Sequence, residues 1–389
     1  MQGVQGRIDA DRVVVEEGCV VEAGAVVRGE EVVLRRGARI GAGTQVDCDL
    51  LELGPGARLG GGGRIVCPRI TLEEGASVGT ELQAELNEHF HLGRHGSMGS
   101  RVAITGQGVR AGEFLWMKSD IIIGGGGARG PRSYLTIGDR STIIDRTFIN
   151  VSEEVRIGSS TALSFNVVII THGAWQPVLE GYRAAFGPVT IGDHAVVYLN
   201  SVIMPGVTVG DYATVAAGSV VLEDVPARCL AAGAPARIRR GPEGYPATPD
   251  DAEVDALLGE VLRDYAATLP VKGARVAWAS ADGRVLAVEL EGRRETVAYL
   301  PRTGPPPSEL GPDGAPTLVL GHGDVGRVFP GAAYFDLASE TVTGELSPLG
   351  EDLRDYLRRW TLRFFNGRPF RTLPQANVQR LKARAAGSR

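Results

Sequence analysis

Aliphatic residues recur at every sixth position over much of residues 15–221. The interval is clearest at the end of this stretch, where six consecutive positions keep it without a slip: Ile191, Val197, Ile203, Val209, Val215 and Val221. An interval of six fits neither the 3.6-residue period of an amphipathic helix nor the two-residue alternation of a long strand. It fits a short strand followed by a corner, and three such units would make one turn of a triangular prism. The pattern therefore predicts a mainly β fold built as a parallel β-helix.

Small and polar residues follow the aliphatic steps. Gly18, Gly37, Gly56 and Gly75 are spaced 19 residues apart, and Gly-Asp comes directly after an aliphatic residue in VTIGDHA and VTVGDYA. Corners need backbone angles, often with positive φ, that bulky residues resist. A flexible linker is the alternative reading of so much glycine, but a linker would lack hydrophobic residues in register.

Two segments interrupt the repeat. Residues 81–134 are interpreted as an irregular insertion, in which Gly124–Gly127 marks a tight bend and His89, His91 and His95 form a cluster. A zinc site is the alternative for these histidines, because histidine is a frequent zinc ligand. We expect no metal and interpret the cluster as part of a polar loop or a partly buried interface. The second interruption is a loop over residues 173–190.

The composition changes after Arg240. Residues 241–251 are interpreted as a linker, because they are rich in proline, glycine and acidic residues. An i, i+3, i+4, i+7 apolar stripe predicts a helix over residues 251–268, strand-like runs flank residues 281–283 as a hairpin, and a second stripe predicts a helix near residues 353–364. We expect a β-helix domain over residues 1–240 and an α+β domain of unknown role over residues 252–389.

Charge and composition exclude several classes of protein. The net charge of −5 and the scattered Lys and Arg residues provide no basic surface for nucleic acid. No apolar run is long enough for a membrane span, and the N-terminus lacks a signal pattern, so we expect a cytoplasmic protein. The four cysteines contain no CxxC pair and are expected to be free thiols, with Cys48 and Cys67 as near neighbours on adjacent turns.

Residues 189–240 resemble the hexapeptide-repeat acyltransferases, especially the galactoside, maltose and surface-polysaccharide O-acetyltransferases. The resemblance rests on the consecutive repeats, the Pro205-Gly206-Val207 corner, the AAGSVV coil and the terminal GAPARIRR. The coils from residue 135 to Gly173 are similar to those that precede the catalytic histidine of that family. The resemblance implies a left-handed winding of the β-helix, a homotrimer, and acetyl-CoA or another acyl-CoA as the acyl donor.

His172 corresponds to the family's catalytic histidine, because it ends a coil and is followed by a loop that leaves the prism. Transfer of an acyl group to a hydroxyl requires removal of a proton, and an imidazole can accept that proton near neutral pH. The resemblance implies that His172 is the general base. Asn150 resembles the asparagine placed near the acceptor, and Trp175 in the following loop is a second acceptor-binding candidate.

Three residues resemble cofactor-binding positions. Ala217 matches a small residue that lets the pantetheine arm lie close to the coil. Arg237 and Arg240 match basic residues that meet the adenosine phosphates of coenzyme A, a role that suits guanidinium groups. Glu223 departs from the pattern, because a lysine is common there and an acid repels phosphate.

The resemblance implies an acyl-CoA-dependent O-acyltransferase, with acetyl as the expected group, acting on a sugar or another small hydroxylated acceptor. The alternative is a β-helix that has kept its scaffold and lost catalysis, serving as an assembly or binding module. The aromatic residues of loop 173–190 would be costly to expose, so a neighbouring subunit is a candidate to cover them.

Overall fold

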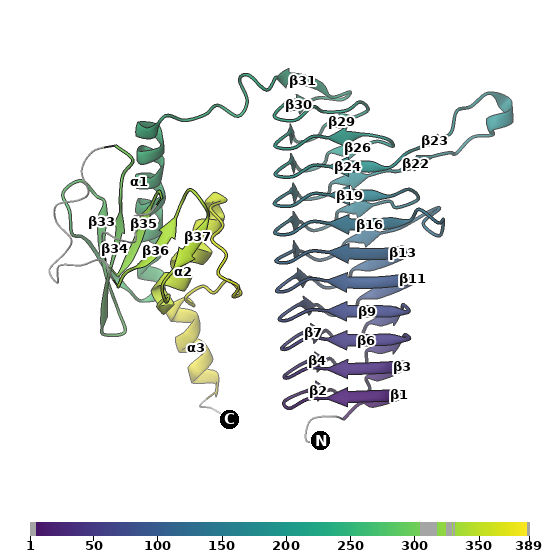
Figure 1. Ribbon diagram of the computed structural model, residues 1–389, viewed down its shortest axis with the longest axis horizontal. Helices are drawn as coiled ribbons and strands as arrows, with labels where there is room; N and C mark the ends of the chain where they lie inside the picture. Colours follow the sequence, from purple (N-terminus) through teal and green to yellow (C-terminus); the bar gives the residue numbers. More distant parts are fainter. Residues whose placement is uncertain (1–4, 304–316, 324–328, 330, 387–389) are drawn as a thin grey trace. The chain divides into compact units, whose positions relative to one another are not determined.

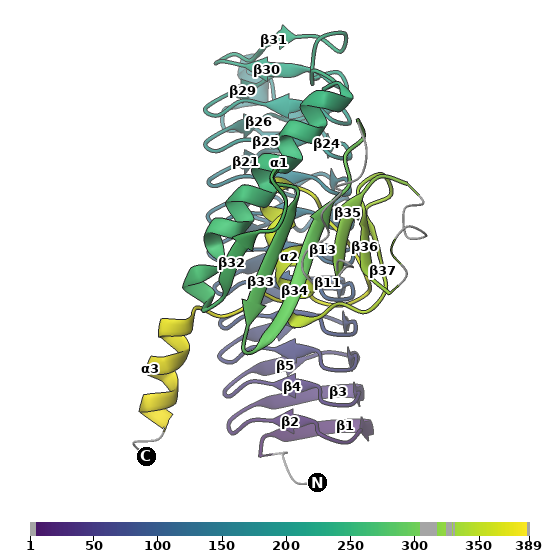
Figure 2. The ribbon, with the colours of Figure 1, turned by 90° about the vertical axis from the view of Figure 1, so that its left-hand side faces the viewer.

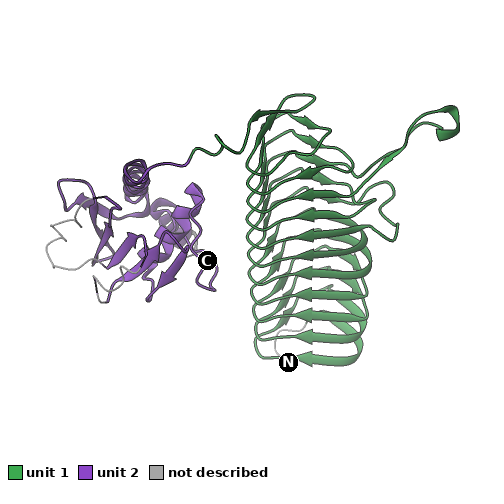
Figure 3. Cartoon of the chain, turned by 45° about the horizontal axis from the view of Figure 1, so that its top comes forward, with its two compact units in different colours: residues 1–247 green, residues 248–389 purple. Residues whose placement is uncertain are grey.

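The computed structural model describes residues 5–303, 317–323, 329 and 331–386 of the chain. It divides into two compact units, Met1–Ala247 and Thr248–Arg389, drawn in different colours in Figure 3. None of the helices in these described ranges is both long and apolar enough to cross a membrane.

Unit 1 is a parallel β-helix (Figure 1). A seventeen-stranded sheet covers two of its sides, because long strands such as β3 (Val26–Leu34) pair with two successive short strands of a neighbouring turn. A twelve-stranded sheet forms the third side. The strands of the larger sheet are β1 (Arg7–Val15), β3 (Val26–Leu34), β5 (Gln45–Asp47), β6 (Leu50–Leu53), β8 (Arg64–Val66), β9 (Arg69–Leu72), β11 (Gln83–Leu92), β13 (Ala103–Ala111), β15 (Ile122–Ile123), β16 (Tyr134–Ile137), β18 (Phe148–Ile149), β19 (Val155–Ile157), β21 (Val168–Ile169), β24 (Val189–Ile191), β26 (Val202–Ile203), β27 (Thr208–Val209) and β29 (Val220–Val221).

The twelve-stranded sheet has one strand in each turn and ends in an antiparallel pair, β30 with β31. Its strands are β2 (Val20–Val21), β4 (Arg39–Ile40), β7 (Arg58–Leu59), β10 (Ser77–Val78), β12 (Ser97–Met98), β14 (Trp116–Met117), β17 (Thr142–Ile143), β20 (Ala162–Leu163), β25 (Val196–Val197), β28 (Thr214–Val215), β30 (Leu230–Ala232) and β31 (Arg237–Arg240).

The residues that keep the six-residue interval fill the axis of the β-helix. The register stacks one such residue from each turn directly on the next, and every member of the column is buried: Val27, Val46, Ile65, Ala84, Ile104, Ile123, Ile149, Ile169, Ile203 and Val221. Burial of these aliphatic side chains provides the main driving force for stacking the turns. The predicted parallel β-helix is confirmed.

The corners use positive φ, as the glycine pattern predicts. Gly18 and Gly24 have φ of 76° and 75° in the first turns, where glycine adopts this conformation without steric cost. Later corners place Asn166 and Asn200 at φ of 58° and 60°. The two amides stack across turns, and Asn166 Nδ2 donates to Asn200 Oδ1 at 2.9 Å. This side-chain bond helps to offset the cost of a non-glycine corner.

The irregular insertion predicted over residues 81–134 is wrong for most of its length. Strands β11 to β15 continue the same turns from Gln83 to Ile123. The repeat was hidden because Phe90, Met98 and Met117 occupy core positions in place of branched aliphatic residues, and all three are buried. Only residues 124–133, which begin with the glycine run, leave the coil between β15 and β16.

A second segment leaves the coil after Thr171. His172–Gly173 form β22, which pairs antiparallel with β23 (Ala185–Phe186), and the short 3-10 helix η1 (Val178–Glu180) lies between them. The resulting hairpin extends from the side of the β-helix and rejoins it at β24 (Figure 1).

Unit 2 contains a mixed six-stranded sheet in the order β32-β33-β34-β35-β36-β37, and so the predicted α+β fold is confirmed. β34, β35 and β36 run parallel, and the other neighbours are antiparallel. Its elements are α1 (Asp251–Thr268), η2 (Pro270–Lys272), β32 (Arg275–Trp278), β33 (Val285–Leu290), β34 (Arg293–Tyr299), β35 (Leu318–Gly321), β36 (Ala333–Asp336), β37 (Thr341–Thr343), α2 (Pro348–Leu357), η3 (Arg358–Trp360) and α3 (Ala376–Ala386).

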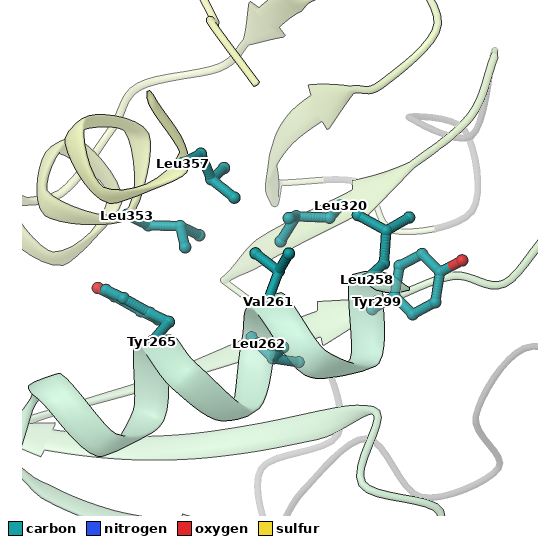
Figure 4. Close-up of a pocket in the computed structure, with 8 residues that line it drawn as sticks. All are labelled: Leu258, Val261, Leu262, Tyr265, Tyr299, Leu320, Leu353 and Leu357. Carbon is teal, nitrogen blue, oxygen red and sulfur yellow. The ribbon is translucent and has the colours of Figure 1, made fainter. Parts of the chain in front are cut away.

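The core of unit 2 lies between helices α1 and α2 and the sheet. Apolar side chains of α1 face α2, β34 and β35 around one small apolar cavity (Figure 4). Helix α1 begins with a capping box, in which Asp250 accepts from the Glu253 backbone N–H and the Glu253 side chain accepts from the Asp250 backbone N–H. The cap and the apolar stripe together explain why residues 251–268 form a helix.

Cys48 and Cys67 provide a test of how closely the turns pack. All four cysteines are free, and burial raises the pKa of Cys48 to about 12 and that of Cys67 to about 11. Thiolate, the reactive form, is therefore scarce at pH 8. We expect iodoacetamide to modify neither residue in the native protein at pH 8 and both after denaturation, as read by peptide mass spectrometry. Rapid labelling of the native protein would contradict this packing.

Candidate active site

His172 stands at the point where the chain leaves the β-helix. Val168–Ile169 complete a turn of the coil, and the next residues after Ile170 are the fully buried Thr171 and then His172. The imidazole is half-buried and stacks at 6.1 Å, centroid to centroid, on Phe186 of the returning hairpin strand. One edge of the ring faces the preceding turn, where it meets Asn150 and Ser152.

Asn150 determines which nitrogen of His172 carries the proton. Its Nδ2 donates to the carbonyl oxygens of Gly124 at 3.0 Å and Gly126 at 3.2 Å, so its Oδ1 must point the other way and accept. That oxygen lies 2.9 Å from His172 Nδ1. Because an amide oxygen can only accept, Nδ1 carries the hydrogen in the neutral ring and donates it. Nε2 is then left with its lone pair, which is the state that a general base requires.

Ser152 supports the same protonation state. Its hydroxyl donates to the Gly126 carbonyl oxygen at 2.6 Å, which leaves the oxygen lone pairs facing His172 Nδ1 at 3.0 Å. The Nδ1–H therefore lies between two acceptors, Asn150 Oδ1 and Ser152 Oγ. Thr171 completes the cluster, because its hydroxyl donates to Asn150 Oδ1 at 2.6 Å. All these contacts favour one ring orientation.

The glycine-rich segment 124–127 lies against the other side of the imidazole. A Cβ atom placed on Gly126 would lie 3.6 Å from His172 Nε2, so a side chain at this position would contact this nitrogen. At position 127, where φ is +79°, a Cβ would lie 2.4 Å from Ser152 Oγ, so this backbone approaches the cluster more closely than a side chain would allow. The glycines thus allow the backbone of this segment to lie close to His172 and Ser152.

An ion pair ties residues 124–133, the excursion that contains the glycine run, to the coil. Arg132 Nη2 donates to Glu153 Oε1 at 2.6 Å, and Arg132 Nε donates to the other carboxylate oxygen. These hydrogen bonds hold the pKa of the buried Glu153 carboxyl below its usual value. The backbone N–H of Glu153 donates to Thr171 Oγ1 at 3.1 Å, so the pair adjoins the residues that position the imidazole.

The structure brings two of the predicted site residues together, His172 and Asn150, but it gives Asn150 a different place from the one predicted. Asn150 is 1% exposed, and its amide bonds to Gly124, Gly126, Thr171 and His172. It is not accessible to an acceptor and instead positions the imidazole. Trp175 lies in the hairpin and is 90% exposed. Its acceptor-binding role stays a prediction.

The three predicted cofactor residues lie in the last turns of unit 1. Ala217 is exposed at the corner between β28 and β29. Arg237 and Arg240 are exposed at the two ends of β31. Arg237 Nη1 lies 3.6 Å from Glu223 Oε1, and because both side chains are well exposed, this pair adds little stability.

The histidine cluster near residue 90 has other partners than a metal. His91 Nε2 lies 3.0 Å from Glu73 Oε1, His89 stacks on Tyr134, and the His95 ring contacts Phe114 at a tilt of 40°. Burial, together with the nearby Arg110, lowers the pKa of His89. Within the described residues, no three His, Cys, Asp or Glu side chains form a group that could hold a metal ion.

Sequence reasoning missed Ser152 and the glycine segment as parts of this site. For Ser152, the sequence distance to His172 could have revealed its place. Asn150 and Ser152 precede His172 by 22 and 20 residues, which is about one turn of the β-helix, so both lie beside it. The role of Gly126 has no such signal, because it depends on how residues 124–133 fold back after leaving the coil.

Comparisons with known proteins agree with the repeat. Residues 188–223 match the family model described as bacterial transferase hexapeptide (six repeats). A Bacillus subtilis (strain 168) protein named "Putative acetyltransferase YvoF" is 37% identical over 86 residues, which cover 22% of this chain and 47% of that protein. The chain therefore spans about half the length of this curated relative.

Two solved structures are also similar. The hexapeptide-repeat-containing acetyltransferase VCA0836 from Vibrio cholerae is 30% identical, with a TM-score of 0.26 over 28% of this chain and 62% of that one. A galactoside acetyltransferase in complex with coenzyme A is 26% identical, with a TM-score of 0.30 over 34% of this chain and 64% of that one.

Proposed function

Since residues 188–223 carry the bacterial transferase hexapeptide repeat, we propose that the chain is an acyl-CoA-dependent O-acyltransferase. The acyl group is acetyl, and the acceptor is a sugar or another small hydroxylated molecule. His172 is the general base. The observation that carries the proposal is the hydrogen bond from His172 Nδ1–H to the buried Asn150 Oδ1, which leaves Nε2 free to accept a proton.

The chemistry follows from that lone pair. Nε2 takes the proton of the acceptor hydroxyl while the hydroxyl oxygen attacks the thioester carbonyl carbon. The tetrahedral intermediate collapses with cleavage of the C–S bond, which forms the ester. The imidazolium then returns the proton to the departing sulfur, giving free coenzyme A thiol. The acceptor hydroxyl approaches Nε2 beside Gly126, which has no side chain to contact this nitrogen.

A direct experiment tests this function. Purified protein is incubated with acetyl-CoA and a panel of mono- and disaccharides, and release of the thiol is followed with a chromogenic disulfide reagent. The proposal requires acceptor-dependent thiol release and an acetylated sugar by mass spectrometry. Absence of transfer with the whole panel, together with no binding of coenzyme A by calorimetry at millimolar concentration, would favour the scaffold without catalysis.

Asn150→Leu tests the positioning role of Asn150. Leucine has a similar size but cannot accept from Nδ1–H, so the imidazole keeps only Ser152 as an acceptor and its preferred tautomer and orientation are weakened. We expect kcat for acyl transfer to fall by about 10- to 100-fold, with little change in the KM for acetyl-CoA. Circular dichroism checks that the coil persists. A rise in KM at constant kcat would instead indicate that Asn150 acts in binding.

Coenzyme A is proposed to lie along the last turns, with its pantetheine arm beside Ala217 and its phosphates near Arg237 and Arg240. Glu223 opposes this arrangement, because its carboxylate pairs with Arg237 at 3.6 Å and repels phosphate.

Glu223→Gln removes that opposing charge. The variant is expected to bind coenzyme A several-fold more tightly, because Arg237 no longer has to exchange a carboxylate for a phosphate. Calorimetry with coenzyme A measures the Kd, and dephospho-coenzyme A serves as the control ligand. Equal or weaker binding by the variant would place the phosphates elsewhere.

A homotrimer is proposed as the working assembly. Trp175, Leu179 and Phe186 of the hairpin are 90%, 98% and 58% exposed in the single chain, which is unusual for residues of this size. A neighbouring subunit would cover them. Light scattering combined with size-exclusion chromatography gives the mass, and a monomer of 41.1 kDa in solution would contradict this assembly.

A further inference from the structure

The end of the chain has a charge unlike that of the rest. Residues 358–389 contain nine Arg and Lys residues and no Asp or Glu, although the net charge of the whole protein is −5. A concentration of one charge of this kind attracts anionic partners.

Buried polar side chains hold the segment before α3 onto unit 2. Arg354 is fully buried and donates to the backbone carbonyl oxygens of Phe364 at 3.3 Å and Pro369 at 2.6 Å. Asp352, also fully buried, accepts from the backbone N–H of Leu373 at 2.6 Å. Residues 361–375 are therefore anchored, and α3 begins immediately after the last anchored residues.

Helix α3 itself extends away from the sheet of unit 2 (Figures 1 and 2). Its main contact within the unit is with η2, near its first residue, Ala376. Val378 and Leu381, three residues apart and so on one side of the helix, are 42% and 59% exposed. An isolated helix of 11 residues is marginal in water, so this one needs a surface that covers its apolar side.

We propose that α3 is an interfacial helix that binds an anionic lipid surface. Its aliphatic side chains are flanked by the exposed Arg380 and Lys382, which is the arrangement that inserts into a lipid headgroup layer while its cations meet anionic lipids. Nucleic acid fits the site less well, because single-stranded chains are bound by aromatic stacking platforms and the exposed apolar residues of α3 are aliphatic. The helix lies on the surface and does not span it.

The test uses the full-length protein in flotation with vesicles. We expect the protein to float with vesicles that contain phosphatidylglycerol and to stay behind with vesicles of pure phosphatidylcholine. Added salt should weaken the binding, because the attraction to anionic headgroups is screened. Equal flotation with both vesicle types, or none with the anionic type, would overturn the proposal.

Two variants and one matched control localise the effect. Arg380→Glu/Lys382→Glu is expected to reduce partitioning onto anionic vesicles by about tenfold or more. Arg293→Glu/Arg294→Glu changes the net charge equally at two exposed residues of β34 and should bind as the wild type does. Leu381→Ser should reduce vesicle binding several-fold without affecting the thermal stability.

A polyanion distinguishes lipid from nucleic acid or another anionic polymer. Retention on heparin or RNA without binding to anionic vesicles would overturn the lipid assignment. The same conclusion would follow if Leu381→Ser left vesicle binding unchanged, or if the control variant lost binding as strongly as the α3 variant.

Discussion

Replacing His172 by Asn is expected to lower kcat for acyl transfer by about 10³-fold, with little change in the KM for acetyl-CoA. Asparagine can keep the hydrogen bond toward Asn150 but provides no basic nitrogen for the acceptor proton. The measurement is acceptor-dependent thiol release from acetyl-CoA under saturating conditions.

His194 supplies the matched control for this substitution. It lies exposed at a corner with φ of 56°, a conformation that asparagine tolerates well, and it stacks on Tyr212 at 4.6 Å. His194→Asn should retain the wild-type rate. If His172→Asn also retains it, His172 is not the base, and if both variants lose activity equally, the loss has a structural cause.

Replacing Asp352 by Ala is expected to be the most destabilising single change in unit 2. Lys272 Nζ lies 2.7 and 2.8 Å from the two carboxylate oxygens of Asp352, and the Lys272 side chain is only 12% exposed. Removal of one partner of a buried ion pair leaves an uncompensated charge, at a cost of about 3–5 kcal/mol. The hydroxyl of Tyr265 and the backbone N–H of Leu373 would also lose their acceptor.

Scanning calorimetry can resolve this effect, because the two units have separate cores. We expect the transition of unit 2 to move down by about 10 °C or more, while that of the β-helix stays in place. Asp352→Asn keeps part of the hydrogen bonding, so its unit 2 transition should lie between those of the wild type and Asp352→Ala. Glu260→Ala, at an exposed position of α1, is the control. A shift no larger than that of the control would show that the ion pair is unimportant.

The β-helix was predictable because one residue type occupies one structural role at a fixed interval. Each aliphatic step is buried by the turns above and below, so position in the sequence translates directly into position in the fold. The prediction failed between residues 81 and 123, where Phe90, Met98 and Met117 fill the same role with a different shape. A search for any buried-type residue at the interval would have found these turns.

The candidate site was predictable only in part. His172 could be named because it ends a coil before a loop that leaves the prism, and Asn150 because it resembles the asparagine of the hexapeptide-repeat acyltransferases. The direction of the Asn150 amide could not be inferred, because it depends on the carbonyl groups of Gly124 and Gly126 after the chain has left the coil. Helix α3 was missed for a related reason: Val378 and Leu381 are its only large apolar residues, and it packs little against its own unit.

Because the strands of each turn of the β-helix pair only with those of the turns next to it, a defect is transmitted over short distances. The catalytic candidates belong to the turns between Phe148 and His172. The first four turns contribute none of these residues and only support the turns that do. Related proteins could therefore gain or lose whole N-terminal turns and keep the same chemistry at a different distance from the first turn.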